Sequence, residues 1–326
     1  MKKILIIRFS SIGDIILTTP VIRCLKKQLP NVEIHFLTKP QYKELLSNNP
    51  YIDCLHLLDK PILQKANELK KMHFDCIIDL HNNLRSLLFK SIINTESYSF
   101  NKLNFEKWLM VNFKINTLPK KHIVERYLET TKTLGVTNDG EGLDYFLPKN
   151  ISIETYNYTS LQNEKYIAFA IGANHFTKKL PNEKIIEICN QINHKIILLG
   201  GKEDEANGEI ISNICAKNII NFCGKLSINE SAFIIKNSLK VITHDTGMMH
   251  IAAAFKKEII SIWGNTIPEF GMIPYYGKLE VGCWMLEVQN LSCRPCSKIG
   301  FSKCPKGHFN CMKLQNIENI ISTTNS

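Results

Sequence analysis

The sequence predicts an α/β protein made of two Rossmann-like domains, whose parallel sheets face each other across a cleft. Three observations support this fold class. Short apolar runs alternate with helical patterns along the whole chain, which is typical of βαβ units. The runs are apolar nearly throughout, as in strands buried on both faces of a parallel sheet. A less periodic stretch, roughly residues 148–163, separates the two halves, and the predicted domains are therefore residues 1–160 and 161–326.

Nine apolar runs are the predicted strands, at residues 3–9, 32–38, 54–58 and 75–81 in the first half and 166–172, 195–201, 218–224, 240–245 and 258–264 in the second. Helices fit between them, and one of these begins at Pro181, a residue favoured in the first helical turn. Ligands of such sheets bind at the carboxyl ends of the strands. The turns that follow the strands should therefore carry the chemistry.

Composition excludes several classes of protein. With 44% hydrophobic and 21% charged residues, the chain is typical of a globular protein. No apolar run approaches the ~18 residues of a membrane span, and "MKKILIIRFSS" reaches Arg8 before a signal-peptide core could form, so we expect a cytoplasmic protein. The net charge of +10 is spread among acidic residues. It indicates no nucleic-acid arm; it suits an anionic substrate or an acidic membrane surface, or reflects ordinary solvated faces.

The stretch "HDTGMMHIAAAF", residues 244–255, is a candidate phosphate site. Asp245 or Thr246 can cap the helix that follows, and Gly247 lets a ligand approach the N–H groups of its first turn. Such a helix start attracts phosphate, although a plain capped helix fits the same residues. His250 could direct a ring nitrogen at the same anion or could simply pack in the core.

Two further turns of the second half complete a nucleotide site. In "GANHFTKKLP", residues 172–181, Lys178 or Lys179 could neutralise a pyrophosphate while Thr177 donates a hydrogen bond. In "LGGKEDE", an acid such as Glu203 or Asp204 could accept both ribose hydroxyls, or these acids could merely complement a helix dipole. Together the turns predict a nucleoside diphosphate in the second domain.

The first domain has a carboxylate where a phosphate loop would lie, in "RFSSIGDIILTTP", residues 8–20. Asp14 would repel a pyrophosphate, so this domain should hold the other substrate. Asp14 would then be a general base, or alternatively the N-cap of the next helix.

Eleven cysteines without an export signal predict reduced thiols. Most should be small buried hydrophobic residues. Four lie close in sequence, near His308: Cys293, Cys296, Cys304 and Cys311. They could hold a structural zinc ion, although reduced cysteines that order a loop beside the cleft are the preferred interpretation.

Four ordered motifs give the chain a family resemblance. They are "ILIIRFSSIGDIILTTPVIRCLKKQLP", "DCIIDLHNNLRS", "GANHFTKKLP" and "THDTGMMHIAAAFKKEIISIWGNTIPEFGMIPYY". The chain resembles glycosyltransferase family 9, the ADP-heptose:lipopolysaccharide heptosyltransferases. The resemblance implies a GT-B fold with the donor in the second domain and the acceptor in the first. The "HNN" at residues 81–83 replaces a more glycine-rich turn of the family.

The resemblance also assigns residues. Asp14 matches the catalytic base, Lys178 the pyrophosphate lysine, and one of Glu203 and Asp204 the ribose-binding acid. Leu226 falls where the adenine is packed. The donor-phosphate motif matches Asp245, Thr246, Gly247, Met248, Met249 and His250, and the acceptor side matches Arg8, Gly13 and Arg85.

The implied function is inverting, metal-independent transfer of a heptose or related sugar from an ADP-sugar. The acceptor would be the lipopolysaccharide inner core or a similar anionic glycolipid of lipid A-Kdo type, reached at the cytoplasmic face of the inner membrane. No Asp-x-Asp occurs in the chain, so we expect no catalytic metal cofactor. A non-catalytic or differently specific sugar-nucleotide-binding protein is the alternative, whereas a dinucleotide oxidoreductase lacks its glycine fingerprint.

Overall fold

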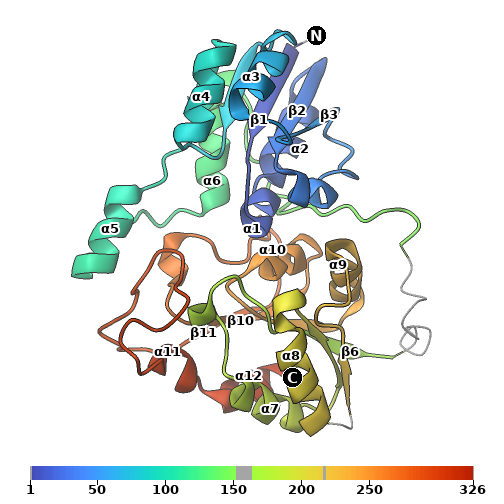
Figure 1. Ribbon diagram of the computed structural model, residues 1–326, viewed down its shortest axis with the longest axis vertical. Coiled ribbons are helices and arrows are strands. Elements are labelled where there is room, and N and C mark those ends of the chain that lie inside the picture. The colour runs from blue at the N-terminus through green and yellow to red at the C-terminus, as the bar shows by residue number, and fades with distance from the viewer. Residues whose placement is uncertain (1, 152–163, 216–217, 326) are drawn as a thin grey trace. The chain divides into compact units, whose positions relative to one another are not determined.

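The computed structural model describes residues 2–151, 164–215 and 218–325 (Figure 1). Most of the predicted linker, and the domain boundary at residue 160, lie outside these residues. The chain forms two compact units. The first unit comprises Met1–Lys102, Lys121–Phe146 and Tyr275–Leu279, and the second comprises Leu103–Lys120, Leu147–Pro274 and Glu280–Ser326.

The described residues of the first unit form a parallel sheet of five strands in the order β3-β2-β1-β4-β5. The strands are β1 (Lys2–Ile7), β2 (Val32–Thr38), β3 (Cys54–Leu57), β4 (Cys76–Asp79) and β5 (Glu96–Ser99). The helices of this unit are α1 (Ile12–Ile16), α2 (Thr19–Gln28), α3 (Ile62–Lys70), α4 (Leu84–Ile93) and α6 (Ile123–Leu128), with 3₁₀ turns at Pro40–Leu45 and Glu129–Leu134.

The second unit repeats the plan with six described strands in the order β11-β10-β9-β6-β7-β8, again all parallel. The strands are β6 (Tyr166–Ala170), β7 (Lys195–Leu199), β8 (Ile219–Asn221), β9 (Lys240–His244), β10 (Glu258–Trp263) and β11 (Cys283–Glu287). The helices are α5 (Asn104–Phe113), α7 (Asn182–Gln191), α8 (Glu205–Ile214), α9 (Ile228–Asn237), α10 (Gly247–Ala254), α11 (Asn310–Lys313) and α12 (Ile317–Asn325), with 3₁₀ turns at Phe176–Lys178, Lys202–Asp204 and Pro268–Phe270.

The predicted α/β class is confirmed, and each of the nine predicted runs overlaps a strand. Strands such as β4 and β6 are buried along their whole length, because helices cover both faces of a parallel sheet. Two edge strands were missed. The β5 sequence "ESYS" is largely exposed and polar, so it carries no apolar run, and β11 is only partly buried.

Each sheet has one place where the strand order reverses. In the first unit, β2 and β3 lie on one side of β1, and β4 and β5 lie on the other. In the second unit the reversal lies between β6 and β9. In open α/β sheets generally, the loops diverge at such a point and ligands bind there, at the carboxyl ends of the strands. Ligand sites are therefore expected after β1 and β4, and after β6 and β9. No described helix is both long enough and apolar enough to cross a membrane.

A buried ion-pair network joins α2 to the segment at residues 137–146. The Arg23 guanidinium is 1% exposed. It donates to Asp139 over 2.7 and 2.8 Å, pairs with Asp144, and donates to the Gly142 carbonyl over 2.9 Å. Burial opposes ionisation of Asp139, but the hydrogen bonds from Arg23 outweigh it and lower the pKa of Asp139 to about 2.

Replacing Arg23 by methionine should destabilise the first unit by about 3 kcal/mol or more, since two carboxylates lose their buried partner. The pKa of Asp139 in the folded chain is below its ordinary value of 3.8. The wild-type stabilisation is therefore complete above about pH 4 and lost as the pH falls towards 2. Urea unfolding of Arg23→Met at pH 7 and pH 3 measures both effects. Lys27→Met, which removes an exposed pair with Glu141, is the control and should change little.

Candidate functional site

The turn after β1 places Asp14 at the third position of α1. One carboxylate oxygen of Asp14 accepts from the Ser11 hydroxyl over 2.8 Å and the Ser11 amide over 3.3 Å. The other pairs with Arg8 over 2.7 Å. Ser11 is the N-cap of α1, so the alternative prediction that Asp14 is the N-cap is wrong. Gly13 precedes Asp14 in the first turn of the same helix and is buried.

Arg8 connects the two turns that flank the strand-order reversal. Its guanidinium is largely buried. It donates to the Ser10 carbonyl after β1, and to the Leu80 carbonyl after β4. It also donates to the Tyr127 hydroxyl of α6 over 2.9 Å. The predicted acceptor clamp thus has internal partners for all three of its nitrogens, and its evident effect is to position Asp14.

These contacts set the charge of Asp14. Burial alone would raise the pKa of its carboxyl group, but the Arg8 guanidinium and the Ser11 hydrogen bonds outweigh burial and lower the pKa below its ordinary value. The carboxylate is therefore ionised at neutral pH. An ionised carboxylate at a switch point can accept a proton from a bound hydroxyl group.

The turn after β4 is built on Asp79, a fully buried residue whose role the sequence did not reveal. Its carboxylate accepts from the amides of His81 and Asn82 over 3.0 and 2.7 Å, and pairs with Lys90 over 3.1 Å. Asn82 has a φ of 47°, a left-handed conformation that asparagine tolerates better than most residues. Asn82 thereby takes the place of glycine in the "HNN" turn.

The β4 turn presents one exposed cation. Arg85 lies in the first turn of α4 and is exposed, so it is available to an anionic ligand. Nearby, the His81 ring packs against Phe9 with centroids 4.8 Å apart. Burial, assisted by the Arg8 charge, lowers the pKa of His81 to about 4, so this ring is neutral at pH 7.

The candidate phosphate site after β9 has the predicted local structure. Thr246 is the N-cap of α10, and its side chain makes no capping hydrogen bond. Asp245, Thr246, Gly247 and Met248 are partly exposed, whereas Met249 and His250 are buried. The positive end of the α10 dipole and the amides of its first turn lie where an anion would bind.

Lys178, in the turn after β6, reaches this site. Its ammonium group lies 2.6 Å from the Asp245 carboxylate and 3.1 Å from the Asp245 carbonyl. The same carboxylate oxygen accepts from the Thr266 hydroxyl over 2.8 Å. Thr266 follows β10 and was missed by sequence reasoning, although a polar residue directly after a strand was the available signal. The structure thus joins the predicted lysine to the predicted phosphate turn.

The neighbouring polar residues have internal partners. The Thr177 hydroxyl accepts from the Phe301 amide over 2.9 Å. Thr177, predicted to donate a hydrogen bond to a phosphate, thus holds the loop that contains Phe301. The buried Asp204 carboxylate pairs with Lys179 over 2.5 Å and accepts from the Gly201 amide over 3.0 Å. Glu203, the other candidate ribose ligand, is exposed. Leu226, the candidate adenine contact, is partly buried in the turn between β8 and α9.

His244, at the end of β9, is a further residue that sequence reasoning missed. It is fully buried, and its Nε2 accepts from the Leu180 amide over 3.0 Å. Burial lowers its pKa to about 4, so the neutral ring holds the Lys178 loop against β9. An ordinary histidine in an apolar strand gave no signal of this role.

The cysteine-rich segment packs against the turn after β10. Arg294 donates to the carbonyls of Gly264 and Thr266, and the Cys296 amide donates to Asn265. Among the residues described, ligand atoms of three or more side chains meet within 4.8 Å at one place, which is outside this segment. The four predicted zinc ligands are thus not assembled here. The pKa of Cys311 is raised to about 12, mainly by burial and secondly by the neighbouring Cys296.

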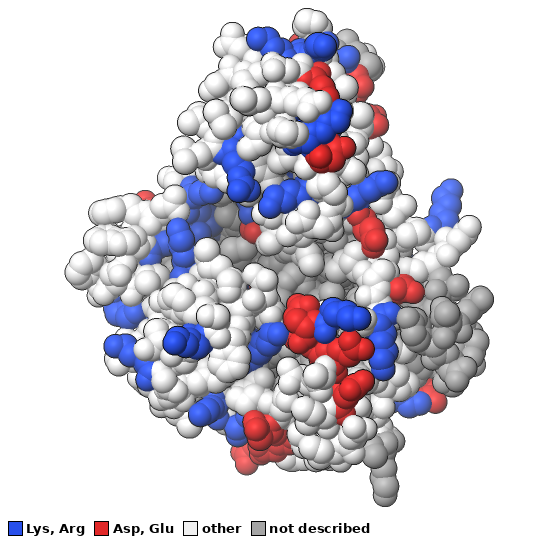
Figure 2. All heavy atoms as spheres, in the orientation of Figure 1, with Lys and Arg blue, Asp and Glu red and all other residues white. Residues whose placement is uncertain are grey.

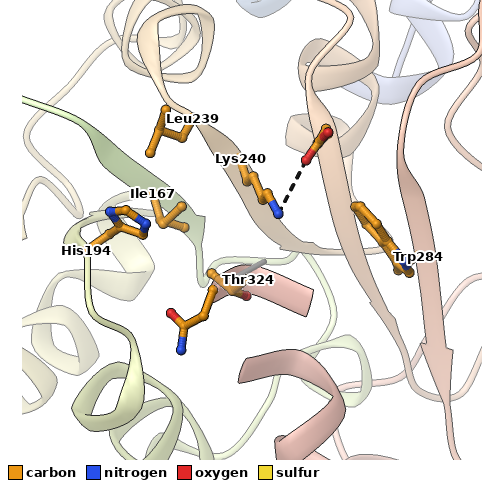
Figure 3. A pocket seen from close by; sticks show the side chains of 8 residues that line it. Ile167, His194, Leu239, Lys240, Trp284 and Thr324 are labelled. Carbon is orange, nitrogen blue, oxygen red and sulfur yellow. Dashed lines mark ion pairs between the residues drawn. The ribbon is translucent and has the colours of Figure 1, made fainter. Parts of the chain in front are cut away.

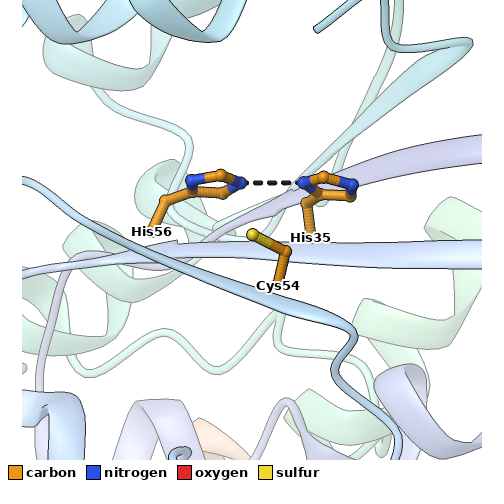
Figure 4. A group of neighbouring side chains, drawn as sticks. All are labelled: His35, Cys54 and His56. Atoms are coloured by element: carbon orange, nitrogen blue, oxygen red, sulfur yellow. Dashed lines mark hydrogen bonds between the residues drawn. The ribbon is translucent and has the colours of Figure 1, made fainter.

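That one place is formed by His35, Cys54 and His56 on β2 and β3 (Figure 4). His35 Nδ1 lies 2.8 Å from His56 Nε2, and His35 Nε2 lies 3.0 Å from Glu33. Two nitrogen ligands of one tetrahedral zinc ion lie about 3.3 Å apart, whereas 2.8 Å is an ordinary hydrogen bond. Burial and the His35 ring lower the pKa of His56 to about 4. The contact is a hydrogen bond between neutral rings.

A pocket of about 540 Å³ lies elsewhere in the second unit (Figure 3). Its lining residues Ile167, Lys240 and Glu258 come from the amino-terminal ends of β6, β9 and β10, opposite the edge where such sheets bind ligands. Lys240 pairs with Glu258 over 3.4 Å and lies over the Trp284 ring. We place no active site in this pocket.

Two Rossmann-like units of parallel strands, each with one reversal of strand order, form the GT-B fold of glycosyltransferases. The chain belongs to glycosyltransferase family 9 (heptosyltransferase), whose model matches residues 62–300.

Comparisons with individual proteins agree. The chain is 29% identical over 291 residues to lipopolysaccharide heptosyltransferase 1 of Campylobacter coli, covering 81% of this chain and 84% of that protein. A glycosyl transferase family 9 structure from Veillonella parvula has a TM-score of 0.70 at 23% identity, with 88% and 86% covered. E. coli heptosyltransferase WaaC with ADP has a TM-score of 0.68 at 17% identity, with 98% of both chains covered.

Replacing Arg8 by methionine should raise the pKa of Asp14, because burial persists while the principal stabilising charge is lost. Ser11→Ala should raise the pKa less, since it removes one hydrogen bond and leaves the ion pair. Carbon-13 NMR titration of labelled aspartate carboxyl groups measures both shifts. An Asp14 pKa that does not move in Arg8→Met contradicts the assigned role of Arg8.

Proposed function

We propose that this glycosyltransferase transfers a heptose from ADP-heptose to a lipopolysaccharide inner-core acceptor, with inversion at the anomeric carbon. The observation that carries the proposal is the ionised Asp14, held by Arg8 and Ser11 at the switch point of the first unit. The name of the Campylobacter coli relative and the ADP in the WaaC structure support this sugar and this nucleotide.

Asp14 is proposed to act as the general base. An acceptor hydroxyl oxygen attacks the anomeric carbon, the bond from that carbon to the ADP oxygen breaks, and the hydroxyl proton passes to Asp14. A carboxylate with a lowered pKa is a weak base for an alcohol. The transfer therefore fits a transition state with oxocarbenium character, in which the hydroxyl group becomes acidic as its oxygen bonds to carbon.

The second unit is proposed to hold the donor. The amides of Gly247 and Met248 at the start of α10, together with Lys178, would bind the diphosphate and stabilise the charge of the departing ADP. In the structure Lys178 is paired with Asp245, and the diphosphate would share this cation. Either Glu203 or Asp204 would bind the ribose and Leu226 the adenine, while His250 would support α10 from its buried side.

The acceptor site is proposed to lie around Gly13 and Asp14, with Arg85 as the cation for acceptor phosphates or carboxylates. Arg85 is exposed at the switch point, and Arg8 lies behind Asp14. Such an acceptor is embedded in a membrane, so the enzyme would work at the cytoplasmic membrane surface.

Asp14→Asn should lower the rate of heptosyl transfer by roughly 10²–10⁴-fold, the usual contribution of a general base. Binding of ADP should be unchanged, since the donor turns belong to the second unit. Transfer is followed by mass spectrometry of the product with ADP-heptose and a lipid A-Kdo acceptor, and ADP binding by calorimetry. Asp59→Asn, a change at an exposed carboxylate, is the matched control.

A wild-type chain that binds ADP-heptose without forming product supports the alternative, a non-catalytic sugar-nucleotide-binding protein. Transfer by Asp14→Asn at the wild-type rate rejects Asp14 as the base. Determination of the product anomer by NMR tests inversion separately.

Lys178→Met should weaken ADP binding and lower the transfer rate, the latter by roughly 10²–10³-fold, as expected when one group that stabilises leaving-group charge is removed. Lys202→Met is the control, since that side chain is 88% exposed.

Because Lys178 and α10 would stabilise the diphosphate charge without a metal, EDTA should leave the wild-type transfer rate unchanged. Loss of transfer in EDTA, restored by magnesium, contradicts this metal-independent mechanism.

A further inference from the structure

Helix α5 carries an aromatic face that the described chain leaves exposed. The helix has no buried residue. Phe105, Trp108 and Phe113 are exposed by 66, 51 and 58%. Their rings contact one another, with centroids 6.1 Å apart between Phe105 and Trp108 and 5.2 Å apart between Trp108 and Phe113. Ile115, just beyond the helix, is also exposed. The side chains thus form one apolar surface, which we call the α5 face.

Polar contacts fix this helix to the rest of the second unit. Lys114 donates to the Pro295 carbonyl over 2.7 Å, and Lys298 donates to Asn104 over 3.4 Å. Lys107 lies over the Phe270 ring, 6.0 Å from its centroid. Lysines anchor the helix while aromatic rings face outward, the reverse of the usual arrangement for a helix on a globular protein.

The surroundings of the α5 face are basic. Residues 103–120, the part of the second unit that contains α5, hold three lysines and one glutamate, a net charge of +2, and Lys298 contacts the start of the helix. Figure 2 shows an almost wholly white lobe at the place where Figure 1 draws α5. Exposed Trp and Phe side chains bordered by lysines are the composition of helices that lie in the interface of anionic membranes. A protein partner would offer no particular reason for this excess of positive charge.

We propose that the α5 face docks on an anionic lipid surface, with Phe105, Trp108 and Phe113 inserted among the headgroups. The contacts by which lysines anchor the helix are made to uncharged groups, a carbonyl, an amide and an aromatic ring, so the positive charge of these lysines still attracts the lipid phosphates. Its biological setting rests on the proposed membrane-embedded acceptor, whereas lipid binding itself does not depend on the transfer reaction. The ten-residue helix lies on the surface, as an interfacial anchor rather than a span.

Vesicle binding tests the proposal directly. The wild-type chain should sediment with vesicles that contain phosphatidylglycerol, and much less with pure phosphatidylcholine. Trp108→Ser/Phe113→Ser should bind the anionic vesicles at least about tenfold more weakly, because two large apolar side chains are removed. Ile210→Ser/Ile214→Ser on α8 is the matched control, since those side chains are 49 and 60% exposed, and it should bind like the wild type.

Tryptophan fluorescence locates the contact. Trp263 is buried and Trp284 is partly buried, so brominated phosphatidylglycerol should quench mainly Trp108, and the quenching should disappear in Trp108→Phe. Equal vesicle binding by Trp108→Ser/Phe113→Ser and the wild type overturns the proposal. So does a wild-type dimer that the same variant converts to a monomer without any lipid binding, which would make a second copy the occupant.

Turnover separates this proposal from the proposed function. With a deacylated, water-soluble acceptor, Trp108→Ser/Phe113→Ser should transfer sugar at the wild-type rate. With the same acceptor in vesicles, the rate should fall in parallel with binding. If the wild type binds vesicles but transfers no sugar to either acceptor, the proposed reaction is rejected and the docking surface is retained. If Trp108→Ser/Phe113→Ser transfers sugar at the wild-type rate to the vesicle-bound acceptor as well as to the soluble one, the docking surface alone is rejected.

Discussion

The buried guanidinium of Arg8 has little water to stabilise its charge, and the Asp14 carboxylate provides the compensating charge. The pair holds together the turns after β1 and β4, because the same guanidinium donates to carbonyls of both. Removing Asp14 would leave the Arg8 charge buried and without its counter-charge, which is far more costly than losing an exposed pair. One interaction thus positions the candidate base, keeps it ionised and links the turns after β1 and β4.

The second unit presents backbone amides and paired side-chain charges at its own strand-order reversal. At its switch point the helix start of α10 supplies fixed amides, while Lys178 and Lys179 are each paired with a carboxylate, Asp245 and Asp204. A cation that is already paired is held in position before a ligand arrives, and less ordering is then needed when an anion binds. The first unit thus presents a fixed negative charge at its switch point, and the second unit presents positive charges that are already held in place.

Much of the fold could be predicted, because buried parallel strands leave long apolar runs in the sequence. The edge strand β5 could not, since its exposed residues carry no such run. Short local motifs predicted Asp14, Lys178 and the α10 turn as site residues, and the structure brings Lys178 to the α10 turn. Arg8, Thr177 and Asp204 show the limit of this approach: their partners Leu80, Phe301 and Lys179 are brought to them by tertiary packing. A motif reveals that a polar residue is present, whereas only the folded chain reveals which group uses it.

Gly172 and Gly200 end the neighbouring strands β6 and β7, and the Asp204 side chain lies directly over them. A Cβ atom at position 172 would lie 2.2 Å from the Asp204 carboxylate, and one at position 200 would lie 2.7 Å from the Asp204 Cβ. A larger residue at either glycine would therefore displace the Asp204 side chain and disturb its pair with Lys179. Substitutions at positions 172, 179, 200 and 204 are therefore coupled, and these four positions should covary in related sequences.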